Sequence, residues 1–108
     1  METSIEHDVQ RIVVNVSGDV DLASADQLKM ALDEVLSGSP AHVIIDMTPV
    51  SFMDSTGLGV LVRALKRARE NDTRLDLVIS NERVLKVLSI TQLDTVLSIH
   101  PSIEAVPV

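Results

Sequence analysis

Residues 52–59, Phe-Met-Asp-Ser-Thr-Gly-Leu-Gly, bring together two hydroxyl side chains, one carboxylate and two glycines. An apolar strand predicted at 43–45 and a short loop precede them. Apolar residues at helical spacing follow them, namely Leu58, Leu61, Val62 and Leu65. The polar groups therefore lie where the chain turns from a strand into a helix. A helix N-terminus presents unpaired N–H groups and partial positive charge, so this turn suits a phosphate, on a ligand or on the protein itself.

Ser55 also has simpler interpretations. Ser55 or Asp54 is an ordinary N-cap, because hydroxyl and carboxylate side chains begin many helices. A catalytic serine in a nucleophile elbow needs a glycine two positions earlier, where this chain has Met53. No motif surrounds the candidate general bases, which are His7, His42 and His100. A serine hydrolase is therefore disfavoured, and no catalytic residue is assigned.

Nucleotide and metal sites are weakly supported as well. Residues 57–59 (Gly-Leu-Gly) lack the third glycine of a dinucleotide fingerprint and the Gly-Lys-Ser/Thr of a P-loop. Gly57 instead predicts a close backbone approach, and Gly59 predicts tight packing of the helix. Three aspartates are interpreted as loop carboxylates, because their spacing matches no calcium loop: Asp19, Asp21 and Asp54. No cofactor and no metal is expected.

Composition favours one small acidic domain spanning residues 1–108. The apolar fraction of 45% supports a core, and an aromatic fraction of 1% makes that core aliphatic. Sixteen acids against nine bases give a net charge of -7, which disfavours binding to nucleic acid or anionic membranes. The chain has no cysteine, no signal-peptide pattern and no apolar run of membrane-spanning length. A cytoplasmic protein without membrane insertion is expected.

The first half of the chain alternates strand and helix patterns. A β-branched run predicts a strand at 12–16, with a weaker strand near 4–7 and a loop at 18–21. Ser24 predicts an N-cap, with Gln27 completing a capping box. One helical stripe follows, formed by Leu28, Leu32, Val35 and Leu36. Residues 38–40 (Gly-Ser-Pro) end that helix, and a buried strand is predicted at 42–46.

The second half continues the alternation. The helix from about Ser55 to Glu70 is expected to bury the four apolar residues named above, and its bases at 63–69 form a solvated face. A strand at 75–79 precedes a helix capped by Ser80 or Asn81, whose apolar residues are Val84, Leu85 and Leu88. A last strand is predicted at 95–99 and a short helix at 101–105.

This order predicts an α/β fold: a mixed, mostly parallel sheet of four to five strands with three to four helices packed against it. The loops that follow parallel strands meet at one edge of such a sheet. Residues 18–21, 54–57 and 80–81 should therefore share one end of the molecule, where ligands and partners bind.

The chain resembles the STAS domain family and, within it, the bacterial anti-sigma factor antagonists. The resemblance covers nearly the whole chain, and its most specific part is the Asp-Ser-Thr-Gly-Leu-Gly motif at 54–59. Residues 18–21, 43–46, 50–53 and 75–77 also carry it. Asp19 stands where the family often has glutamate, and residues 89–91 (Ser-Ile-Thr) stand where a glycine is frequent.

The resemblance implies a non-enzymatic partner switch. Ser55 matches the phosphorylation site, with Thr56 as second choice. The unphosphorylated protein binds an anti-sigma factor that is also a serine kinase, phosphorylation releases it, and a serine phosphatase resets the cycle. The implied partner-binding residues are Asp19, Asp21, Asp54, Ser55, Thr56 and Gly57. The alternative is a constitutive STAS subunit of an ABC-type lipid transporter, which binds the transporter's ATPase without phosphorylation.

Overall fold

The computed structural model describes residues 1–108 as one six-stranded sheet with helices packed against it. The strands are β1 (Glu2–His7), β2 (Ile12–Val20), β3 (His42–Asp46), β4 (Val50–Met53), β5 (Arg74–Val78) and β6 (Ile99–His100). The helices are α1 (Ala25–Ser37), α2 (Ser55–Glu70) and α3 (Glu82–Ile90), and two short 3-10 helices are η1 (Leu93–Thr95) and η2 (Ile103–Ala105).

The strands are arranged in the order β1-β2-β3-β5-β6, and β4 pairs with the far end of β2. The pair β1–β2 is antiparallel, and every other pair is parallel. The predicted mixed, mostly parallel sheet with three helices is confirmed. The structure has one strand more than the largest number predicted.

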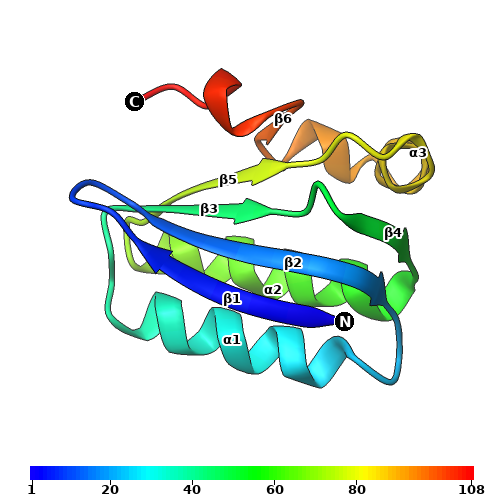
Figure 1. Cartoon of the computed structure of the whole chain (residues 1–108), viewed down its shortest axis with the longest axis horizontal. Helices are drawn as coiled ribbons and strands as arrows, with labels where there is room; N and C mark the ends of the chain where they lie inside the picture. The colour runs from blue at the N-terminus through cyan, green and yellow to red at the C-terminus, as the bar shows by residue number, and fades with distance from the viewer.

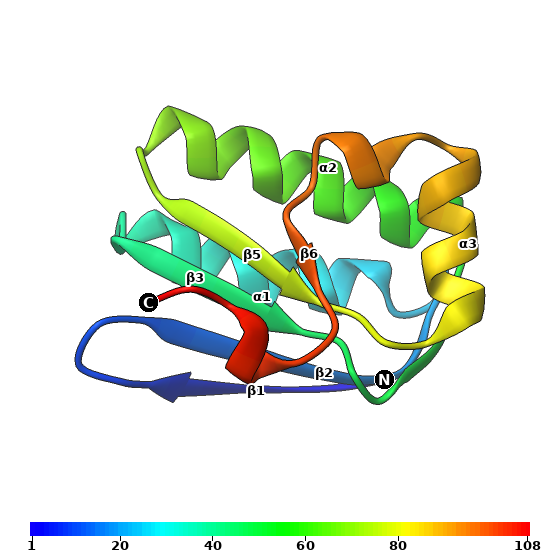
Figure 2. The same ribbon diagram turned by 90° about the horizontal axis from the view of Figure 1, so that it is seen from above.

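The two faces of the sheet are covered differently. Helices α1 and α2 contact each other and cover one face (Figures 1 and 2). The main core lies beneath them and includes the whole predicted stripe of α1. On the opposite face, Val106 of the C-terminal segment packs on a small cluster of Val13, Ile44 and Val78. None of the helices is long and apolar enough to cross a membrane.

The predicted loop at 18–21 is largely wrong, because β2 continues through Val20. Its last residues pair with β4, which the sequence analysis placed in a loop. Gly18 marks an irregularity in this pairing and has φ of 85°, a left-handed conformation that favours glycine. The chain turns at 47–49. The first part of β2 pairs with β3, and its last residues pair with β4.

Three further expectations are corrected. Val62 is 42% exposed, and the small side chains of Ala64 and Ala68 fill the helix face that packs on the core. The predicted strand at 95–99 is largely irregular: Thr95 ends the 3-10 helix η1, which begins after Gln92 in the left-handed region, and only Ile99 and His100 pair with β5. The predicted helix at 101–105 is the short η2.

Candidate functional site

The carboxyl ends of β2 and β4 meet at the start of α2. The Asp54 N–H donates to the Val20 carbonyl oxygen at 3.1 Å, which fixes the β4–α2 turn against the end of β2. Helix α3 packs against β4 at the same end (Figure 1), and Asn81 is its N-cap. The predicted common end for residues 18–21, 54–57 and 80–81 is therefore confirmed.

Asp54, rather than Ser55, caps α2. Its Oδ1 accepts N–H groups from Thr56 at 2.9 Å and Gly57 at 3.2 Å. The backbone donors that could hold a free anion are thus already bound by a carboxylate of the protein. No cavity of the structure is lined by residues 54–57. The turn is therefore poorly suited to a phosphate-bearing ligand.

Ser55 is the first residue of α2, and its side chain is exposed. Its hydroxyl takes part in no hydrogen bond with the protein, unlike the neighbouring Asp54 carboxylate. Thr56, the second-choice hydroxyl, is partly buried. The two hydroxyls of the motif therefore differ in access, and Ser55 is the more accessible one.

The carboxylates of Asp19 and Asp21 accept hydrogen bonds within the protein. Asp19 Oδ1 accepts the Ser51 hydroxyl at 2.9 Å, which joins β2 to β4. Asp21 Oδ1 accepts the N–H groups of Ala23 and Ser24, both at 3.1 Å. The predicted capping box is wrong: Ser24 makes no side-chain cap bond to α1, and its hydroxyl accepts the Asp21 N–H at 3.0 Å. Asp21 accepts backbone N–H groups just before α1, as expected of a loop carboxylate. The loop assignment of Asp19 is wrong, because Asp19 lies in β2 and bonds to Ser51 of β4.

Gly57 is buried beneath the turn. A Cβ at this position lies 2.8 Å from Met53 Cγ and from Val20 Cγ1, and 3.2 Å from the Val20 carbonyl oxygen. The predicted close backbone approach at Gly57 is therefore confirmed. Gly59 is different, because a Cβ there meets no atom within 4 Å, and its predicted packing role is wrong. Gly57 shapes the turn from below, whereas Gly59 faces open space.

Comparison with known proteins identifies this architecture. The model of the STAS domain family matches residues 1–106. The chain belongs to the STAS domain family. Over 94 residues it is 36% identical to the anti-sigma-B factor antagonist of Listeria monocytogenes, which covers 87% of this chain and 82% of that protein.

Solved STAS structures agree with this fold. An anti-sigma factor antagonist from Mycobacterium paratuberculosis gives a TM-score of 0.90 at 27% identity, covering 95% of this chain and 87% of that one. The phosphorylated form of the Bacillus cell fate determinant SpoIIAA gives a TM-score of 0.73 at 20% identity, covering 96% of each chain. At that identity the second likeness establishes the fold alone.

Two apolar side chains of this STAS domain stand beside the turn and were not assigned from the sequence. Phe52, the single aromatic residue, is 49% exposed at the end of β4, and Leu22 is 78% exposed after Asp21. A lone aromatic inside the motif was the available signal for Phe52. Exposed apolar side chains beside an accessible hydroxyl are suited to contact with another protein.

A second polar cluster lies on the other face of the STAS sheet. Asp76 is 2% exposed, and its two carboxylate oxygens lie 2.7 Å from His42 Nε2 and 2.8 Å from His100 Nε2. Arg74 Nε lies 2.9 Å from Asp76 Oδ2. Two of the histidines considered as bases are therefore engaged with Asp76 on a face remote from Ser55. The signal for this cluster was an aspartate between Leu75 and Leu77 in an apolar strand.

The electrostatics of the cluster favour an ionised Asp76. Burial acts to raise the pKa of Asp76, but hydrogen bonds from His100, Ser98 and His42 and the charge of Arg74 outweigh it and hold that pKa below its ordinary value.

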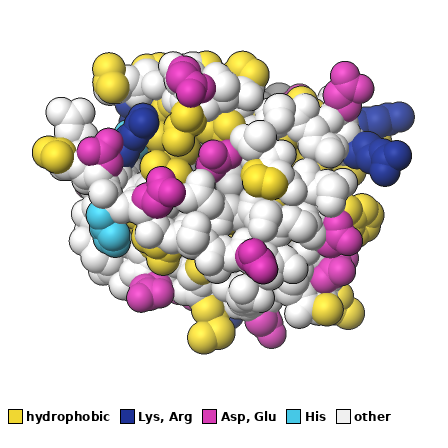
Figure 3. Space-filling view, in the orientation of Figure 1, with side chains coloured by type: hydrophobic (Ala, Val, Ile, Leu, Met, Phe, Trp, Pro, Cys, Tyr) yellow, Lys and Arg dark blue, Asp and Glu magenta, His cyan; other side chains and the backbone are white.

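Figure 3 shows the face of the domain that carries β1, with acidic side chains scattered over it and basic ones gathered near its two ends.

Proposed function

We propose that this protein is an anti-sigma factor antagonist controlled by phosphorylation of Ser55. In its unphosphorylated form it binds an anti-sigma factor that is also a serine kinase, and the sigma factor is released. The observation that carries this proposal is the exposed, unpartnered Ser55 hydroxyl, which follows a capping Asp54 carboxylate and is more accessible than the partly buried Thr56. The relationship to the Listeria antagonist supports the class of partner.

The charge at the turn explains why a phosphate acts as a switch. A phosphate adds about -1.5 to -2 charges. It does so beside Asp54, at the sheet end that also carries Asp19 and Asp21. A partner surface that covers Ser55 must bury this dianion next to carboxylates. A loss of about a thousandfold in affinity corresponds to about 4 kcal/mol, which the burial of an unpaired charge readily supplies.

The same phosphate should leave folding nearly unchanged. Ser55 points to solvent at the positive end of a 16-residue helix, where negative charge is favourable. A structure that shares this fold, SpoIIAA, has been solved in a phosphorylated form. The proposed switch therefore acts on the interface rather than on the stability of the domain.

The six residues assigned from the sequence divide into two roles in this proposal. Ser55 accepts the phosphate, and Thr56 and Asp54 flank it. Asp19 and Asp21 hold the end of β2 and the following loop, and Gly57 allows the turn to sit against Val20. The protein itself performs no catalysis: the kinase activity belongs to the anti-sigma partner, and a serine phosphatase resets the cycle.

Phosphopeptide mapping after incubation with the cognate kinase and ATP tests the site. Phosphate is expected on Ser55 in the wild type and in Thr56→Ala, and on neither residue in Ser55→Ala. In a titration against the kinase, Ser55→Ala should bind like the wild type, and Ser55→Glu should bind at least about tenfold more weakly.

Two outcomes contradict the proposal. Phosphate on Thr56 alone moves the site by one residue. No phosphate on either residue, with an active cognate kinase present, rejects the switch and favours the constitutive transporter subunit. A stable complex with an ABC-type ATPase is the measurement that then identifies that subunit.

A further inference from the structure

Gly59 has no packing role within the domain. It lies one turn after Ser55 on the exposed side of α2, and a Cβ there meets nothing within 4 Å. Glycine in a helix interior costs about 0.8–1.0 kcal/mol relative to alanine. Glycine at this position therefore lowers the stability of the helix, and no contact within the protein compensates for that loss.

The same side of α2 carries an apolar hollow one turn further on. Val62 is 42% exposed, and Val96 from the segment after η1 is 44% exposed. Together with Leu65 they line a shallow cavity of about 360 Å³, whose rim is formed by Lys66, Arg69 and Glu70. Val62 and Val96 face solvent outside the core, whereas Leu65 is partly buried and packs against it.

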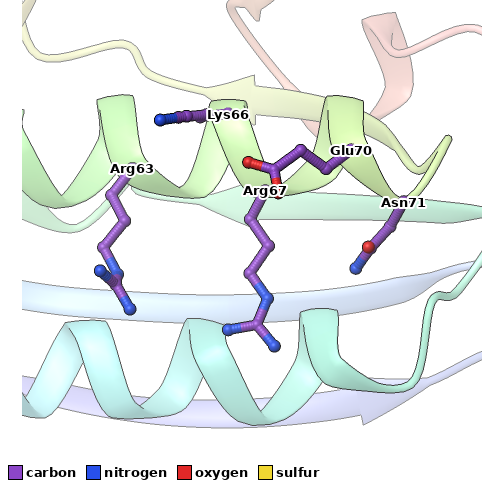
Figure 4. Close-up of a pocket in the computed structure, with 5 residues that line it drawn as sticks. All are labelled: Arg63, Lys66, Arg67, Glu70 and Asn71. Carbon is purple, nitrogen blue, oxygen red and sulfur yellow. The ribbon is translucent and has the colours of Figure 1, made fainter.

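Charge is strongly segregated onto α2. The helix carries four of the nine basic residues of the chain and one of the sixteen acidic residues. Arg63 and Arg67 reach across to α1 (Figure 4), where they lie 3.4 Å and 3.6 Å from the carboxylate of Asp33. Lys66 does not extend toward α1 in the same view, and neither Lys66 nor Arg69 forms an ion pair.

These residues form one continuous surface, which we name the α2 stripe: Ser55, Gly59, Val62, Lys66 and Arg69. All five are exposed, and their spacing of four, three, four and three residues keeps them on one side of the helix. The stripe begins at the candidate phosphorylation site and runs for about 21 Å at 1.5 Å per residue.

We propose, on the basis of the proposed function, that the anti-sigma factor binds along the α2 stripe with an acidic, amphipathic segment. Its backbone passes close over Gly59, an apolar side chain enters the hollow at Val62, and its carboxylates face Lys66 and Arg69. Charge complementarity selects this occupant, because α2 carries four of the nine basic residues of this acidic protein, and Lys66 and Arg69 of the stripe form no ion pair. Phosphorylated Ser55 then repels an acidic partner directly, which joins the switch to the rest of the contact.

A glycine substitution separates binding from folding. Gly59→Ala should raise the thermal midpoint by about 3–5 °C, because alanine is the better helix former. The same variant should bind the anti-sigma kinase about tenfold more weakly, and Gly59→Leu more weakly still. The control is Gly38→Ala at the end of α1, whose Cβ makes an ordinary 3.8 Å contact and lies outside the stripe. Its affinity for the kinase should stay at the wild-type value.

A charge reversal tests the identity of the occupant. Lys66→Glu should slow association with the kinase at least about fivefold at low salt and flatten the salt dependence of the affinity. Arg11→Glu makes the same change in net charge just before β2, at the opposite end of the sheet, and should leave both quantities near the wild-type values.

The outcomes distinguish this inference from the proposed function. If Ser55→Glu weakens binding while Gly59→Leu and Lys66→Glu bind like the wild type, the stripe is rejected and the switch stands. If the unphosphorylated wild type fails to bind the kinase, both are rejected. If Lys66→Glu changes self-association in sedimentation but leaves kinase affinity unchanged, the occupant is a second copy of this chain and the acidic partner segment is rejected.

Discussion

The Ser55 turn and the Asp76 cluster use similar chemical groups for opposite purposes. At Asp76, three polar side chains from three strands converge on one buried carboxylate, and both of its oxygens have partners. At the Ser55 turn, the carboxylate of Asp54 caps a helix and the adjacent hydroxyl is exposed and unpartnered. The first region stabilises the fold, and the second leaves one reactive group available.

The contrast shows why the more elaborate polar cluster is the weaker candidate for function. A buried carboxylate with two histidines resembles catalytic machinery, yet every group in it is bound to a neighbour within the protein. Ser55 has simple surroundings, and its lack of partners is what makes it open to a kinase. Under the proposed function, the unpartnered Ser55 hydroxyl rather than the titratable Asp76 cluster marks the partner-binding surface.

Asp76→Ala should give the largest loss of stability. Removing one member of a buried ionic cluster leaves its partners without compensation and costs about 3 kcal/mol. The matched control is Asp33→Ala, which removes a carboxylate from a half-exposed pair with Arg63 and Arg67 and should cost no more than about 1 kcal/mol. Denaturant unfolding measures both. Equal losses of unfolding free energy in the two variants would show that the buried cluster stabilises the fold no more than the half-exposed pair does.

The pH dependence of the unfolding free energy should show how much the ionised Asp76 carboxylate stabilises the fold. Burial raises the pKa of Asp76, but the bonds from His100, Ser98 and His42 and the charge of Arg74 lower it below the ordinary 3.8. The unfolded chain therefore binds a proton at Asp76 more readily than the folded chain does. The stabilisation is fully present above the ordinary pKa of the unfolded chain and is lost as the pH falls through the lower pKa of Asp76 in the folded protein. The stability difference between the wild type and Asp76→Asn should shrink as the pH is lowered below about 4. A constant difference across the acid range would contradict this.

The features predicted well from the sequence rest on local patterns. The stripe of α1, the bounds of α2 and the cap at Asn81 follow from helical spacing and capping chemistry within a few residues. The strand-to-helix turn at Asp54 followed in the same way, although the sequence did not decide between Asp54 and Ser55 as the cap. The shared end of the loops followed from the topology of parallel strands.

The features that were missed depend on distant parts of the chain. In β4 only Val50 and Met53 are buried, so the strand shows no alternation, and its pairing with β2 is what defines it. Asp76 finds its histidine partners 34 and 24 residues away. Val62 looked like a core residue by its spacing, but the buried face of α2 runs through Leu58, Leu61, Ala64 and Ala68 and leaves Val62 exposed. Tertiary packing decided each of these outcomes.

Gly57→Ala should destabilise the protein by about 1–3 kcal/mol, the usual cost of overpacking. The added methyl group meets Val20 and Met53 at 2.8 Å, so the end of β2 or the start of α2 must move. Gly59→Ala is the matched control, because it makes the same chemical change two residues later in open space and should stabilise the helix. Denaturant unfolding of the two variants should therefore give shifts of opposite sign. A neutral Gly57→Ala would show that the turn adjusts without strain.

Substitutions of Asp54 should give the smallest change in stability. They test whether the Asp54 carboxylate has a role beyond capping α2, in contrast to the purely structural Asp76. Asp54→Ala removes the acceptor of the Thr56 and Gly57 N–H groups and should cost about 1 kcal/mol. Asp54→Asn keeps a side-chain oxygen that can cap the helix, so its stability should stay within about 0.5 kcal/mol of the wild type. We expect Asp54→Asn nevertheless to slow phosphorylation of Ser55, because the carboxylate beside the hydroxyl helps to position it in the kinase. The rate of phosphate transfer, measured beside the unfolding free energy, separates the two effects. Wild-type rates in Asp54→Asn together with slow transfer in Asp54→Ala would restrict Asp54 to a capping role, as structural as that of Asp76.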